Sequence, residues 1–172
     1  FNTAFANGVT ITSGNIAATY DIAVAAGLST VDMTVTIAAT TQTGASTETS
    51  SIVTGSGADT ITYTDTGWVG AASGSASGTF ATDTNAGDDT INVSFGTLTN
   101  DQTSSFIVIT GGSGKDTITV NDAKVNDDDG TGVVGHVTFA FAAGDSNVVN
   151  YDTITGFDLA TAALVSDGLD FA

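Results

Sequence analysis

A glycine-aspartate motif recurs along this chain at a nearly constant spacing, and this internal repeat restricts the possible folds more than any other feature. Four copies align on Gly57, Gly87, Gly114 and Gly144, which are separated by 30, 27 and 30 residues. A weaker copy that lacks the glycine lies around Asp32. Regular repeats of this length indicate stacked units, because a single unit cannot bury its apolar face alone.

Each glycine turn lies between two runs of strand-forming residues. The runs before the turns cover residues 51–53, 78–81, 106–109 and 136–141. The runs after the first three turns, at 60–63, 90–93 and 117–120, alternate Thr or Asn with a large apolar residue. This period of two is typical of a strand with one buried face. The repeat unit is therefore predicted to be strand, acidic glycine turn, strand.

The connectors at 67–77, 97–105 and 121–135 are polar and have no helical periodicity. We therefore predict an all-β fold, a β-solenoid or β-roll-like stack that forms a single domain over residues 1–172. Its units run roughly over 20–50, 51–77, 78–105, 106–135 and 136–172. The alternative is a β-sandwich in which the repeats pair as hairpins.

The charge of the chain is strongly negative and comes almost entirely from aspartate. Two Lys or Arg residues stand against 19 acidic residues, which gives a net charge of −17, and Glu48 is the only glutamate. Nucleic acid and anionic membranes are excluded as partners, because the chain has almost no basic residues to contact phosphate. Aspartate suits turns and cation-binding loops, so bound cations are expected. The alternative is a merely solvated acidic surface.

The absence of cysteine indicates where in or outside the cell the protein functions. Without cysteine the chain has neither disulfides nor a thiolate zinc site. Divalent cations at the millimolar concentrations found outside cells would supply the missing cross-links, which favours an extracellular location. No apolar run is long enough for membrane insertion.

Calcium is the cation that the turns suit best. It prefers six to eight oxygen ligands, both carboxylate and backbone carbonyl. Gly57, Gly87 and Gly114 would expose carbonyl groups, and an Asp follows each two residues later. In stacked turns these carboxylates would form a column of like charges that requires cations between them. The predicted carboxylate ligands in the turns are Asp59, Asp88, Asp89, Asp116 and Asp145.

The third copy resembles a known repeat. Residues 111–119 match every fixed position of the RTX nonapeptide, Gly-Gly-x-Gly-x-Asp-x-apolar-x, while 54–62 and 84–92 depart at one and two glycines. Residues 151–158 resemble the segment that closes many RTX domains, which implies Asp152 and Asp158 as further ligands. The chain thus resembles RTX calcium-binding proteins, especially bacterial S-layer proteins and large secreted adhesins. Unlike the family, it carries the motif once per repeat rather than every nine residues.

These features predict a secreted, calcium-stabilised structural protein that assembles with copies of itself into a surface layer or filament. The alternative is an adhesin or accessory module that binds cell-surface glycans through an exposed aromatic such as Trp68. Catalysis is not expected. The aspartates lie in turn motifs, and His136 is the only histidine, so a Ser-His-Asp triad would depend on that residue alone.

Overall fold

The computed structural model describes residues 9–12, 21–39, 47–65, 77–95, 104–122, 136–157 and 168–171. All regular structure in these residues is β-strand, in twelve strands. No helix among them is long and apolar enough to span a membrane.

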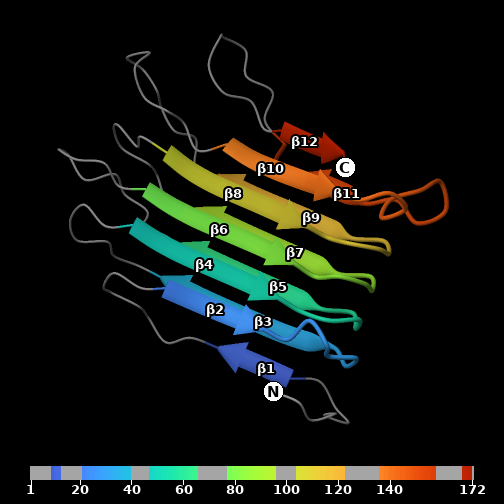
Figure 1. The fold of residues 1–172 in the computed structure, drawn as a ribbon, viewed down its shortest axis with the longest axis horizontal. Coiled ribbons are helices and arrows are strands. Elements are labelled where there is room, and N and C mark those ends of the chain that lie inside the picture. Colours follow the sequence, from blue (N-terminus) through green and yellow to red (C-terminus); the bar gives the residue numbers. More distant parts are fainter. Residues whose placement is uncertain are drawn as a thin grey trace.

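The strands form two six-stranded sheets (Figure 1). The odd sheet has the order β1 (Val9–Thr12), β3 (Met33–Ala39), β5 (Thr60–Asp65), β7 (Thr90–Phe95), β9 (Thr117–Asp122), β11 (Thr153–Thr155). The even sheet runs in order from β2 (Asp21–Ala25) through β4 (Thr47–Val53), β6 (Ser77–Asp83), β8 (Ser104–Thr110) and β10 (His136–Phe141) to β12 (Gly168–Phe171).

The chain alternates between the two sheets, and each strand pairs in parallel with the strand two places along the chain. For example, Thr60 pairs with Thr90, and Thr90 pairs with Thr117. This is the solenoid predicted from the repeat, and the alternative of paired hairpins is wrong because every strand pair described is parallel. Strands β4, β6 and β8 begin four, one and two residues before the predicted unit boundaries at 51, 78 and 106, whereas β10 begins at the predicted residue 136.

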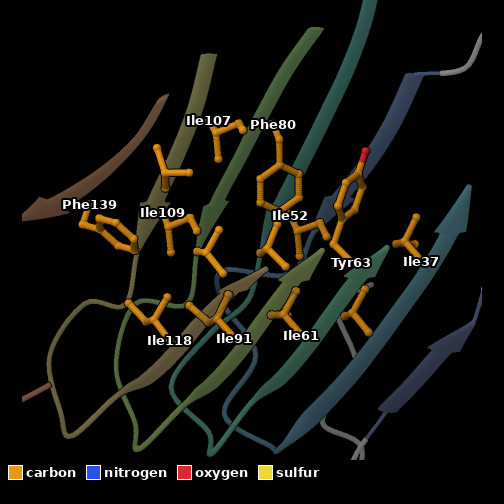
Figure 2. Packing of buried hydrophobic residues seen from close by; sticks show 14 of the residues in the cluster. Ile37, Ile52, Ile61, Tyr63, Phe80, Ile91, Ile107, Ile109, Ile118 and Phe139 are labelled. Carbon is orange, nitrogen blue, oxygen red and sulfur yellow. The ribbon is translucent and has the colours of Figure 1, made fainter. Parts of the chain in front are cut away.

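The core lies between the two sheets and follows from the alternation in the sequence. Side chains at every second position of a strand point inward, and the parallel register stacks them in columns. Figure 2 shows Phe80 beside Tyr63, with isoleucines from both sheets around them; the two rings lie 4.3 Å apart. The fully buried large side chains are Val35, Ile52, Ile61, Tyr63, Phe80, Ile91, Val93, Ile109, Ile118, Val137 and Phe139. Burial of each contributes about 1.5–3 kcal/mol.

Candidate functional site: a buried column of aspartates

The acidic turns stack on one another along one edge of the solenoid, where each even strand passes to the next odd strand (Figure 1). Their glycines allow this close approach. Gly87 and Gly114 have φ values of 144° and 145°, a region that L side chains rarely adopt. A Cβ on Gly87 would collide with the carbonyl of Gly57, and one on Gly114 with the carbonyl of Gly87. The turns are thus held one strand spacing apart.

Three aspartates immediately before the odd strands form a column inside this edge. Asp59, Asp89 and Asp116 precede Thr60, Thr90 and Thr117, which pair with one another across β5, β7 and β9. Their side chains are only 1%, 1% and 0% exposed. The parallel register therefore places three ionisable carboxyl groups above one another, as the sequence predicted, and the structure also buries them.

One oxygen of each carboxylate is engaged in a ladder of hydrogen bonds to backbone amides of the preceding turn. The amide of Met33 donates to Oδ1 of Asp59 at 2.8 Å, and the amide of Asp59 donates to Oδ1 of Asp89 at 2.7 Å. The amide of Asp89 donates to Asp116 at 3.0 Å, and that of Asp116 donates to Asp152 at 2.9 Å. The column therefore has four carboxyl groups and ends against Met33.

The second oxygen of each fully buried carboxylate has no hydrogen-bond partner. Oδ2 of Asp59, Asp89 and Asp116 are all buried and unpaired. A buried, unsatisfied polar atom costs about 1–3 kcal/mol, and more when the group carries a charge. Three such atoms in register are the feature that most clearly points to a ligand, and a column of cations would satisfy all of them.

The pKa values of three carboxyl groups of the column, those of Asp89, Asp116 and Asp152, are all raised. Burial raises the pKa of Asp89 from its ordinary value of 3.8 to about 6, although the hydrogen bond from the Asp59 amide opposes the change. Burial likewise raises the pKa of Asp116 to about 7, and repulsion from Asp152 and Asp89 adds to the effect. The pKa of Asp152 is also raised by burial. Without a counter-ion, burial makes these three groups harder to ionise than an exposed aspartate.

A second, outer column lies at the preceding position of each turn. The amide of Ala58 donates to Asp32 at 2.9 Å, and the amide of Lys115 donates to Asp88 at 3.0 Å. Both aspartates are exposed, and the Lys115 ammonium lies 5.5 Å from the Tyr151 ring centre. The predicted ligand Asp88 thus belongs to the solvent side of the turns and not to the buried column.

The fourth and fifth copies take a different register from the one predicted. Alignment on glycine matched Asp145 to the motif, but Asp145 instead closes a local turn by accepting the Ala142 amide at 2.6 Å. Asp152, predicted from the closing segment, occupies the column because Thr153 pairs with Thr117. At the other end Met33, not Asp32, precedes the paired residue Thr34 and so stands in register with Asp59.

The triplet Asp-Thr-Ile is the signal that would have found this register. It occurs at Asp59, Asp89, Asp116 and Asp152, each time with the Asp directly before an odd strand.

Thr84 is a residue close to the column that the sequence did not single out. Its hydroxyl donates to the carbonyl of Gly111 at 2.7 Å and ties one turn to the next. The hydroxyl of Thr54, one coil earlier, is buried without a partner.

Two predictions concern residues outside those described, namely the ligand Asp158 and the aromatic Trp68. Within the described residues, no group of three or more His, Cys, Asp or Glu side chains is arranged around one metal position. The column instead offers one carboxylate per turn, so an ion would take carboxylates from two adjacent turns. Oxygen ligands beyond these would be backbone carbonyls or water.

Comparison of the chain with protein-family models, with curated proteins and with solved structures finds no match.

Proposed function

We propose that this chain is a calcium-loaded β-solenoid that serves as an extracellular structural subunit and assembles with copies of itself. The observation that carries the proposal is the set of three buried, unpaired Oδ2 atoms in the aspartate column. A structural role suits a site whose charged groups are buried inside the fold and out of reach of a substrate.

The ions would be held by pairs of aspartates from adjacent turns. The candidate pairs are Asp59 with Asp89, Asp89 with Asp116, and Asp116 with Asp152, since each pair is joined by an amide-to-carboxylate hydrogen bond. Calcium would supply positive charge that keeps the carboxylates ionised and would cross-link neighbouring coils. Its preference for oxygen ligands in flexible geometry fits this donor set, as does the RTX resemblance of residues 111–119.

If folding depends on calcium, the chain would fold only after its export to a calcium-rich environment. A column of buried carboxylates without cations opposes folding, so the chain would fold tightly only where calcium is abundant. The same coupling suits a protein that must not assemble before it leaves the cell.

The ends of the solenoid support assembly. Within the described residues, β11 and β12 are the edge strands at one end, and β1 and β2 are those at the other. The β12 side chain of Phe171 is 72% exposed while it stacks on Phe141 at 5.5 Å. Open edges of parallel strands bind further strands readily, and contacts between unlike ends propagate without closing.

The test is light scattering of the purified chain with calcium and with calcium plus excess chelator. We expect particles to grow only with free calcium, and growth to be lost in Asp116→Asn. The matched control is Asp145→Asn, outside the column, which should assemble like the wild type. Assembly that persists in chelator would overturn the proposal.

A further inference from the structure

The outer face of the odd sheet carries a regular lattice of threonines. One column consists of Thr34, Thr60, Thr90, Thr117 and Thr153, and a second of Thr36, Thr62, Asn92, Thr119 and Thr155. These side chains point away from the core, because the residues between them, such as Ile61, Ile91 and Ile118, are buried. The pairing of β1 with β3 places Thr10 and Thr12 next in register. From β3 to β11, every odd strand therefore contributes Thr-x-Thr to this face, except β7, which contributes Thr-x-Asn.

The parallel register fixes the dimensions of this lattice. Neighbouring strands lie about 4.8 Å apart, and alternate residues of a strand lie about 6.6 Å apart. Threonine is β-branched and holds few χ1 rotamers, so each hydroxyl and each methyl group repeats in nearly the same orientation. All strand pairs of the odd sheet are parallel, and Figure 1 shows the successive coils of the stack lying side by side. The face is therefore close to a flat, rigid array of alternating hydroxyl and methyl groups.

The described outward positions of this face carry no charged side chain, in a chain whose net charge is −17. Its remaining described outward positions are Ala38, Thr64, Ser94 and Asn121. The even sheet, built by the same repeats, is irregular on its outer face, where Asp83, Val108, Thr138 and Asp170 occupy outward positions. Strand propensity alone would apply to both sheets equally, so it does not account for the lattice on one of them.

We propose that the outer face of the odd sheet binds the surface of ice. The spacing between neighbouring strands is close to a repeat distance of oxygen atoms in hexagonal ice, so ranks of hydroxyl groups can replace lattice water. The methyl groups between them favour ordered over liquid-like water at the face. Charged side chains would hold a tightly bound hydration shell that does not match the lattice, and none occurs among the outward positions described. The inference goes beyond the structural role and needs only the folded solenoid.

The experiment measures thermal hysteresis and inhibition of ice recrystallisation on the calcium-loaded chain. We expect a freezing-point gap and faceted ice crystals for the wild type. Thr119→Lys, on β9 of the odd sheet, should lose most of both activities. The matched control is Thr138→Lys on β10 of the even sheet, which is also one strand from the end of its sheet and should retain them. Circular dichroism establishes that both variants are folded.

Asn92 offers a variant expected to gain activity. Asn92→Thr completes the second threonine column on a central strand and should increase thermal hysteresis above the wild type. A folded wild type without any effect on ice would overturn the inference, and so would equal losses in Thr119→Lys and Thr138→Lys. Binding to insoluble chitin or cellulose without any effect on ice would also overturn it and would assign the face to a crystalline polysaccharide. None of these results depends on whether calcium promotes assembly.

Discussion

The three fully buried carboxyl groups of the column are each hydrogen-bonded through one oxygen and unsatisfied through the other. The ladder of amide donors positions Asp89 and Asp116 but does not compensate the loss of water around them, because burial is the largest cause of their raised pKa values. The site is therefore positioned in advance for a cation and is costly without one.

The raised pKa values predict how the stability of the calcium-free protein depends on pH. Asp89 and Asp116, with pKa values of about 6 and about 7, bind protons more readily folded than unfolded. The free energy of unfolding should therefore fall as pH rises from about 4 to about 7, by about 1.4 kcal/mol per pKa unit for each group. Melts in chelator should give a higher midpoint at about pH 5 than at about pH 7.5. A lower midpoint at acidic pH would contradict this.

An isosteric substitution separates the charge of the column from its shape. Asp116→Asn keeps an oxygen for the Asp89 amide but removes one buried charge. In chelator we expect its melting midpoint to equal or exceed that of the wild type, and its pH dependence to be weaker. With calcium it should gain less stability than the wild type. A loss of stability in chelator equal to that in calcium would indicate that the carboxylate acts only as a turn residue.

At this scale the sequence predicted Asp59, Asp89 and Asp116 correctly as a stacked column. It did not place Asp145, because a glycine and an aspartate also form an ordinary local turn, and here the Ala142 amide closes one. The unpaired Oδ2 atoms depend on how side chains pack around them and could not be predicted from spacing.

The turns are the elements that set the distance between coils, and their glycines differ sharply in what surrounds them. Gly114 has a φ of 145° and no room for a Cβ, whereas Gly144 has a φ of 99° and nothing within 4 Å of an added Cβ. Gly114→Ala should destabilise by about 3 kcal/mol or more through collision with the Gly87 carbonyl, and Gly144→Ala by about 1 kcal/mol through strain alone. Chemical denaturation measures both, and equal losses would contradict close stacking at Gly114.

The strands were predicted well because alternation of polar and apolar residues fixes which face is buried. The runs at 60–63, 90–93 and 117–120 all lie in odd strands, with Ile61, Ile91 and Ile118 in the core. The turn before Met33 could not be aligned with the other copies from the sequence, because its length differs from theirs. Ala25 pairs with Val53, but Thr34 pairs with Thr60, so this turn is two residues longer than the next and its Leu28 is 95% exposed.

The whole molecule is a stack in which each coil contacts only its neighbours. Stability in such a stack is approximately the sum of the coils and the interfaces between them. A cation between two turns strengthens one interface, so the effect of several cations should accumulate along the solenoid. Unfolding in chelator should accordingly become less cooperative, with a broader thermal transition than in calcium, as a scan by circular dichroism would reveal. Transitions of equal width would indicate that calcium does not act between coils.

Cations between the buried aspartates are proposed to stabilise the solenoid. The most direct measurement is the thermal unfolding midpoint of the wild type with millimolar calcium and with excess chelator at neutral pH. We expect a midpoint several degrees higher in calcium, since a ligand that binds only the folded state stabilises it by mass action. Identical melting curves would contradict it and would indicate that the aspartates of the column serve only as turn residues.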